Sequence, residues 1–161
     1  MTEECLTSRY PIILVHGVLL KDFKFFKAFG LIEKTLKNAG FKVYTAKTDG
    51  FGTVETNAGQ LRAFVNDIRQ REGADKVNLI AHSKGGLDAR YMIEHLDMAD
   101  AVASLTTLCT PHRGSPIASF ILRYPSWILQ CIAFWINLWY RIFGDRYPNA
   151  IAVCHQLQLH P

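Results

Sequence analysis

Residues 77–91, VNLIAHSKGGLDARY, constrain the fold of this chain more than any other stretch of its sequence. An apolar run typical of a buried strand ends at Ser83, and a helical pattern follows directly. Such a turn holds a serine hydroxyl out of the sheet and points the amino end of the helix at the group that the hydroxyl attacks. Ala81 replaces the first glycine of the usual G-x-S-x-G pattern, and Gly85 keeps the second. The stretch therefore predicts that Ser83 is a nucleophile, the alternative being a serine that only caps the helix.

Strand and helix patterns alternate along the chain as far as residue 109. Apolar or β-branched runs predict strands over 11–15, 41–48, 76–82 and 102–109. Amphipathic patterns predict helices over 23–40, 56–73 and 85–96, the first with Phe26 and Phe29 on its apolar face. This alternation predicts a parallel sheet with helices on both faces, built as one domain over 1–161.

The loop after the first predicted strand, Val15-His16-Gly17-Val18, is expected beside Ser83. The backbone N–H groups of Val18 and Lys84 are therefore candidates for binding an oxyanion. We expect the His16 imidazole to stabilise its own turn, because a general base should come from a later loop.

Composition excludes several classes of function. The chain is 49% hydrophobic and 20% charged, which indicates a folded globular protein. Its formal charge of +4 is scattered, with no basic stripe for nucleic acid. The four cysteines are far apart and are expected to be free thiols, so we expect no metal site and no cofactor. The first ten residues lack an apolar run, and we therefore expect no signal peptide and a cytoplasmic location.

Residues 124–140 carry no charge and lie between Arg123 and Arg141. They are shorter than the roughly 20 apolar residues of a membrane-spanning helix. Three interpretations remain open: a helix that covers an apolar cleft, a helix that lies on a lipid surface through 119–143, or one more core helix.

Three motifs, PIILVHG (11–17), AHSKGGLDARY (81–91) and TLCTPHRGSP (107–116), resemble the bacterial triacylglycerol lipases of the α/β-hydrolase fold. The resemblance runs from about residue 10 to nearly residue 157. It implies an α/β-hydrolase-like sheet, truncated here after about four strands, and substrates among long- or medium-chain carboxylic esters.

The resemblance also implies roles for individual residues. It makes Ser83 the nucleophile and the amides of Val18 and Lys84 the oxyanion hole, with 117–143 as a mobile lid. The residues that support this site by their place in the motifs are His16, Gly17, Ala81, His82 and Gly85.

The catalytic acid and histidine of that family follow two further strands, as does its calcium site, and the sequence ends before them. Only Ser83, Asp145 and His155 stand in the expected order of nucleophile, acid and base. Asp145 lies in a predicted turn and His155 in a predicted helix, so this set is a makeshift one.

The other polar candidates have structural interpretations. Side chains that follow one another around a tight turn diverge, which argues against His82 as the base of Ser83. We expect His112 to bond nearby backbone and His95 to lie on a helix surface, and we expect Asp88 and Arg90 to form a structural pair.

The sequence thus predicts an N-terminal portion of a serine ester hydrolase with weak or no activity alone. It also predicts that the strand over 102–109 is an exposed edge. Two alternatives are a catalytically silent half-domain that pairs with a partner chain supplying the missing strands, and a membrane-associated protein.

Overall fold

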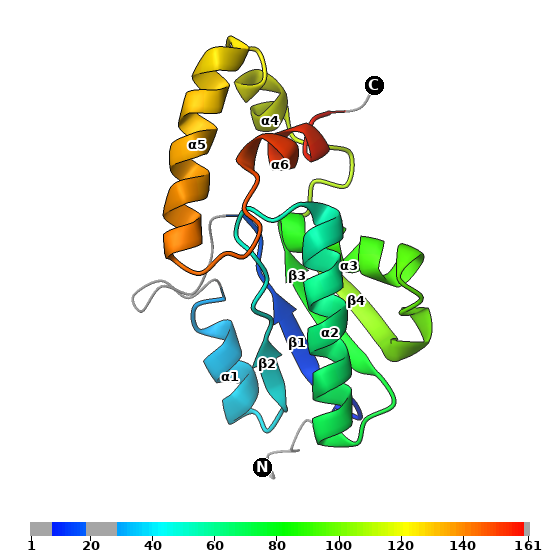
Figure 1. Ribbon diagram of the computed structural model, residues 1–161. Coiled ribbons are helices and arrows are strands. Elements are labelled where there is room, and N and C mark those ends of the chain that lie inside the picture. Colours follow the sequence, from blue (N-terminus) through cyan, green and yellow to red (C-terminus); the bar gives the residue numbers. More distant parts are fainter. Residues whose placement is uncertain (1–7, 19–28, 160–161) are drawn as a thin grey trace.

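The computed structural model describes residues 8–18 and 29–159. Four strands form one sheet in the order β2-β1-β3-β4, and every neighbouring pair is parallel (Figure 1). The strands are β1 (Ile12–Val15), β2 (Val43–Thr45), β3 (Val77–His82) and β4 (Val102–Leu108). The helices are α1 (Ile32–Asn38), α2 (Val54–Glu72), α3 (Lys84–His95), α4 (Pro116–Ile121), α5 (Ser126–Ile142) and α6 (Ala150–Gln156), with a 3-10 turn over Ala99–Ala101. The predicted α/β class with a parallel sheet is confirmed.

Some elements differ in extent from the sequence prediction. The helix expected over 23–40 is described only from Ile32, because residues 19–28, with Phe26, lie outside the described part. The strand predicted over 41–48 is shorter in the structure, where β2 covers only Val43–Thr45. It pairs with β1, which is four residues long. Helix α2 begins earlier than expected because Thr53 Oγ1 accepts a hydrogen bond from the Thr56 N–H at 3.3 Å. Gly73 ends it with φ at 59°, as its glycine predicts.

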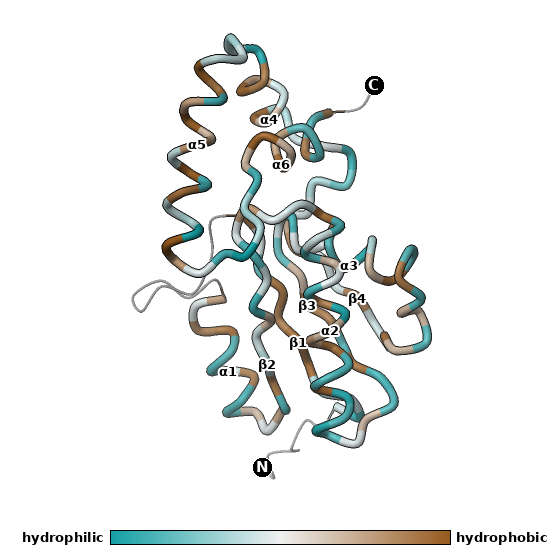
Figure 2. The backbone as a smooth tube through the Cα atoms, viewed as in Figure 1, coloured by the Kyte–Doolittle hydropathy of each residue, from teal (hydrophilic) through white to brown (hydrophobic). Residues whose placement is uncertain are grey.

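The two central strands, β1 and β3, are rich in hydrophobic residues (Figure 2). Their apolar side chains are buried on both faces of the sheet. On one face, Ile13 and Leu79 pack against α2 and α3. On the other face, Ile12 and Leu14 pack with Phe29 and Leu36 from around α1. A strand buried on both faces reads as a continuous apolar run, which explains the sequence of β1.

Strand β4 is the edge of the sheet beside β3, as predicted. No residue of β4 is fully buried, and Ser104 and Thr106 are exposed. Its outer backbone groups therefore lack a strand partner among the described residues.

Helices α4, α5 and α6 lie beyond the carboxyl ends of the strands (Figure 1). Helices α4 and α5 occupy most of the 117–143 range that was predicted as a lid. Many residues of α5 are hydrophobic (Figure 2). Its large exposed apolar side chains are Trp127, Ile132, Phe134, Trp135, Leu138, Trp139 and Ile142. None of the helices in the described ranges is long and apolar enough to cross a membrane.

Candidate active site

Ser83 occupies the turn between β3 and α3 in a strained backbone conformation. Its φ is 54° and its ψ is −130°, a region that residues other than glycine rarely adopt. Backbone contacts on both sides hold it there. The Ser83 N–H donates to the Leu108 carbonyl at 2.8 Å, and the Ser83 carbonyl accepts from Thr110 Oγ1 at 2.9 Å. The end of β4 thus fixes a half-buried serine at the carboxyl end of the sheet, where α/β proteins bind their ligands.

The loop after β1 packs directly against this turn. A Cβ atom added to Gly17 would lie 2.6 Å from Ser83 Cβ, and one added to Gly85 would lie 2.4 Å from the His16 carbonyl oxygen. Both positions therefore require glycine, which explains two residues of the sequence motifs. Ala81 is fully buried in the core beneath α2 and α3, where its methyl group fits.

The two predicted oxyanion donors lie at this junction. Lys84 is the first residue of α3, and the first amides of a helix have no partner within the helix. Val18 follows Gly17 and is half-buried against a cluster that includes Phe51 and Tyr140. The arrangement is suited to placing two N–H groups near the Ser83 hydroxyl.

The His16 side chain is held by hydrogen bonds within the protein. Its imidazole is buried, its Nδ1–H donates to the Gly17 carbonyl at 2.9 Å, and Nε2 accepts from Thr48 Oγ1 at 3.4 Å. These contacts agree with the expected role of stabilising the turn.

The other histidines of the described ranges, His82, His95, His112 and His155, are not bound to Ser83. Within the described ranges, no hydrogen bond joins the Ser83 hydroxyl to an imidazole, and the buried His82 Nδ1 has no partner. His112 accepts from Arg90 at 3.2 Å through Nδ1 and donates to Thr107 Oγ1 at 3.2 Å through Nε2. Its ring thus binds side chains, whereas backbone partners were expected. His95 is exposed, as expected.

The structure does not bring Asp145 and His155 to Ser83. Asp145 is buried in the turn after α5, and its Oδ2 accepts from the Phe51 N–H at 3.1 Å. His155 is exposed on α6. The general base of a serine mechanism is therefore not visible in the described part of the chain.

Two carboxylates join the turn after α5 to the loop before α2. Asp145 reaches Phe51, while Asp49 Oδ2 accepts from the N–H groups of Arg146 and Tyr147 at 3.0 and 2.8 Å. We call this reciprocal pair, Asp49 and Asp145, the clasp. It fixes the base of α5 against the sheet domain.

A buried ion pair lies next to the candidate nucleophile, and sequence reasoning missed it. Lys84 Nζ and Asp88 Oδ1 are 2.6 Å apart, and each side chain is 1% exposed. Burial raises the pKa of Asp88 to about 6, although the Lys84 ammonium pulls it down. The expected pairing of Asp88 with Arg90 is wrong: Asp88 points inward, whereas Arg90 is exposed and contacts Glu94 at 3.4 Å. The signal in the sequence was the i, i+4 spacing of Lys84 and Asp88.

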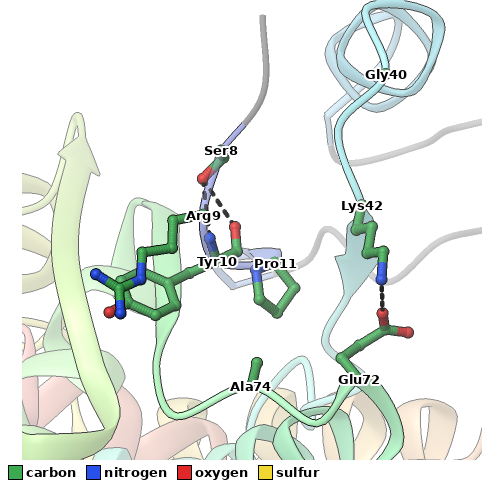
Figure 3. Close-up of a pocket in the computed structure, with 8 residues that line it drawn as sticks. All are labelled: Ser8, Arg9, Tyr10, Pro11, Gly40, Lys42, Glu72 and Ala74. Carbon is green, nitrogen blue, oxygen red and sulfur yellow. Dashed lines mark hydrogen bonds and ion pairs between the residues drawn. The ribbon is translucent and has the colours of Figure 1, made fainter.

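The region around Ser83 is the main candidate for an active site among the described residues. No group of three or more potential metal ligands is present among the described residues. A cavity of about 300 Å³ opens at the other end of the sheet (Figure 3), lined by Ser8, Arg9, Tyr10, Pro11, Gly40, Lys42, Glu72 and Ala74. These residues precede β1 and β2 or lie at and just after the end of α2. The cavity therefore lies at the amino ends of the strands, away from Ser83.

Known proteins with similar sequences are lipases. The chain is 43% identical over 120 residues to a triacylglycerol lipase from Pseudarthrobacter phenanthrenivorans, covering 71% of this chain and 37% of the relative. It has the same identity over 120 residues to a triacylglycerol lipase from Burkholderia plantarii, covering 71% of this chain and 33% of the relative. The chain thus spans only about a third of the length of these curated relatives.

Solved structures agree with the sequence relatives. The mature form of a Bacillus licheniformis lipase, BlEst2, superposes with a TM-score of 0.67 at 26% identity, covering 92% of this chain and 54% of that one. A metagenomic carboxyl esterase superposes with a TM-score of 0.69 at 18% identity, covering 92% of this chain and 42% of that one, which shows the fold alone.

Fold and relatives together define a lipase- or esterase-like hydrolase of the α/β-hydrolase fold, represented here in part. The sequence profile of the family described as Palmitoyl protein thioesterase matches residues 11–145, and the chain belongs to that family. The resemblance to lipases that the three sequence motifs indicated is confirmed.

Proposed function

We propose that this chain is the N-terminal part of a carboxylic ester hydrolase, a lipase or esterase, with Ser83 as its nucleophile. The observation that carries the proposal is the Ser83 backbone at φ 54°, between a buried strand and the first residue of a helix. A merely capping serine needs no positive φ, and α3 has no side-chain cap hydrogen bond from Ser83.

In this mechanism the Ser83 oxygen attacks the carbonyl carbon of an ester. A new C–O bond forms, the hydroxyl proton passes to a general base, and the negative charge on the carbonyl oxygen is bound by the amides of Val18 and Lys84. The bond to the alcohol then breaks, the alcohol takes the proton, and an acyl-enzyme remains. Water then attacks the acyl carbonyl carbon and gives a proton to the base. The bond to the Ser83 oxygen breaks, Ser83 takes the proton back, and the carboxylic acid leaves.

We propose that the base and its acid come from sequence outside residues 1–161, in the same polypeptide or in a partner chain. Two observations support this. The relatives extend well beyond the matched region, and the exposed β4 offers an edge on which further strands can pair. Without a base, a serine site keeps only the part of its catalysis due to the oxyanion hole and binding, roughly 10³–10⁴-fold over water.

The substrate class follows from the surroundings of the site. Helices α4 and α5 present apolar side chains beyond the carboxyl end of the sheet, which suits an ester with an apolar acyl chain. We also propose that residues 119–143 contact lipid surfaces, because the exposed side chains of α5 combine tryptophans with Arg141 near the helix end.

Covalent labelling tests the nucleophile. The purified chain is exposed to a fluorophosphonate and its intact mass is measured, with Ser83→Ala as the test variant and Ser126→Ala, an exposed serine on α5, as the control. One adduct that is lost only in Ser83→Ala supports the proposal. An adduct that persists in Ser83→Ala contradicts it.

Co-expression separates the source of the base. The chain is produced alone and together with the polypeptide encoded downstream, or as the longer reading frame. A rise of labelling rate by roughly 10³-fold or more in the longer or paired form indicates that the base lies there. An equal rate in both forms contradicts an external base. The base would then have to lie within this chain, with Asp145 and His155 as the candidates.

A further inference from the structure

We propose that Asp88 is a positioning residue for the oxyanion hole: it holds the Lys84 side chain inside the protein and thereby fixes the Lys84 backbone N–H beside Ser83. This inference rests on the proposed function of Ser83 and Lys84, and it adds a residue outside the five-residue G-x-S-x-G pattern over 81–85.

The direction of the Lys84 side chain is the first observation. Lysine is rarely buried unless it is paired. Lys84 could have extended into solvent from the first turn of α3, yet its ammonium lies in the interior, 2.6 Å from Asp88. The residue is thus held at two points, by the strained turn on its amino side and by the ion pair at the end of its side chain.

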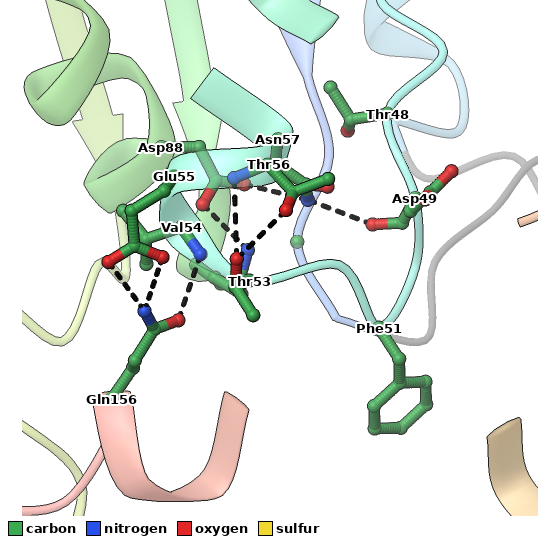
Figure 4. Close-up of polar contacts among 12 residues, drawn as sticks. Thr48, Asp49, Phe51, Thr53, Val54, Glu55, Thr56, Asn57, Asp88 and Gln156 are labelled. Carbon is green, nitrogen blue, oxygen red and sulfur yellow. Dashed lines mark hydrogen bonds and ion pairs between the residues drawn. The ribbon is translucent and has the colours of Figure 1, made fainter. Parts of the chain in front are cut away.

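The Asp88 carboxylate is itself held on both oxygens. Oδ1 binds Lys84, and Oδ2 accepts from Asn57 Nδ2 at 3.1 Å. Asn57 comes from the first turns of α2 and also donates to the Asp49 carbonyl at 2.9 Å, so that it lies between Asp88 and Asp49 (Figure 4). A Cβ atom on Gly52 would lie 2.1 Å from Asn57 Oδ1, so this loop closes tightly over the amide.

These contacts link the candidate oxyanion donor to the base of α5. The Asp49 carboxylate belongs to the clasp and binds the backbone of Arg146 and Tyr147. Polar contacts therefore run from Lys84 through Asp88 and Asn57 to the segment that carries the apolar helix. Because the side chains of Lys84, Asp88, Asn57 and Asp49 are all buried, moving one of them disturbs the next.

Positioning matters because an oxyanion donor must lie about 2.7–3.1 Å from the place where the charge develops. A misplacement of about 1 Å costs roughly 10²-fold in rate. Replacing Asp88 by a neutral residue removes the charge that faces the Lys84 ammonium in the interior and weakens the contact at the end of that side chain. We expect the first residue of α3 to be held less firmly as a result.

The test compares three variants of the full chain. Asp88→Asn removes the counter-charge. Lys84→Met with Asp88→Leu replaces the pair by apolar groups, which often restores stability without restoring the charge contact. Glu94→Gln removes the exposed acidic partner of Arg90 on the same helix and serves as the control. Folding is monitored by thermal unfolding, and fluorophosphonate labelling rates are compared between samples of equal folded fraction.

We expect labelling of Asp88→Asn to be about tenfold to 10²-fold slower than wild type and the apolar pair to stay slow despite restored stability, whereas Glu94→Gln labels normally. An apolar pair that is stable and labels at the wild-type rate overturns the proposal, because the ion pair would then serve the fold alone.

A second readout decides the inference even where Ser83 does not label. The backbone amide resonance of residue 84 is followed in ¹H–¹⁵N spectra of the same variants, and we expect it to shift in Asp88→Asn relative to Glu94→Gln. An unchanged resonance overturns the positioning role. Absence of labelling in the wild type would instead count against the proposed chemistry of Ser83 in this chain.

Discussion

Two regions of the molecule differ sharply in how closely they are packed. Around β1, β3 and α3, glycines pack in contact with backbone, and Lys84 and Asp88 are paired in the interior. At the β4 edge and along α5, by contrast, the strand edge is exposed and large apolar side chains face solvent. The comparison teaches that the region around Ser83 is closely packed within this chain, while the β4 edge and α5 present surfaces typical of an interface. The expected effects of substitution therefore fall from the first region to the second.

The largest effect is expected for Lys84→Met. The substitution leaves the Asp88 carboxyl buried without its cation, and breaking a buried pair in this way costs about 3–5 kcal/mol. Urea unfolding of the variant measures the loss. A loss below about 1 kcal/mol would show that the first region is looser than its burial indicates.

Next comes the pH dependence of stability that Asp88 contributes. Burial raises its pKa from 3.8 to about 6, so the folded state holds the proton more tightly than the unfolded state. The contribution is fully present below pH 3.8 and is lost as the pH rises through about 6, a change on the order of 3 kcal/mol. Unfolding free energies measured across this range in wild type and Asp88→Asn isolate the effect. A wild-type minus variant difference that grows with pH would contradict the assigned direction.

Gly85→Ala is expected to destabilise the protein by about 2–3 kcal/mol through overpacking. The new methyl group would meet the carbonyl oxygens of His16 and Val15 at 2.4 and 2.8 Å, and backbone cannot easily move away. Gly59→Ala is the control, because nothing lies within 4 Å of a Cβ there and the position is helical. The control should be neutral or more stable, by up to about 1 kcal/mol. Equal thermal stability of the two variants would contradict the close packing at Gly85.

At the boundary between the regions, Asp145→Ala should cost about 1–2 kcal/mol, because the Phe51 N–H loses a buried acceptor. Proteolysis should then cut first between α5 and α6, where the clasp is opened. Asp145→Asn keeps an acceptor oxygen and should retain most of the protection, which distinguishes loss of the hydrogen bond from loss of charge.

The smallest change in stability is expected on the open side. Trp135 is 68% exposed, so Trp135→Ser should alter the free energy of unfolding by no more than about 0.5 kcal/mol. Its effect should appear in binding to phosphatidylcholine vesicles, measured by co-sedimentation, where loss of a large apolar group weakens association. Arg62→Ser, an exposed substitution on α2, controls for a general change of surface. Unchanged vesicle binding would argue against a lipid-facing α5.

Features that depend on local sequence patterns could be predicted from the sequence, whereas buried polar contacts could not. The β1 and β3 strands, the turn at Ser83 and the exposed edge at β4 follow from local patterns: apolar runs, glycine spacing and the order of elements. The Lys84–Asp88 pairing and the clasp do not, because a charged residue reads as a surface residue until its neighbours in space are known. Asp145 reaches Phe51 across 94 positions of sequence. No periodicity encodes such a contact. The order of residues along the chain therefore makes Asp145 a catalytic candidate, although the structure gives it a structural partner.

The strand order also has a consequence for how the protein is made. Along the chain, β1 emerges first, β2 adds to one side of it, β3 adds to the other side, and β4 adds outside β3. The sheet can therefore grow outward during translation without inserting a late strand between earlier ones. The most recently synthesised strand is always available at one margin, where a ribosome still engaged in elongation would deliver any following segment. A nascent chain paused after β4 would already have the strand that bonds the Ser83 turn, with its growing end next to the exposed edge of the sheet.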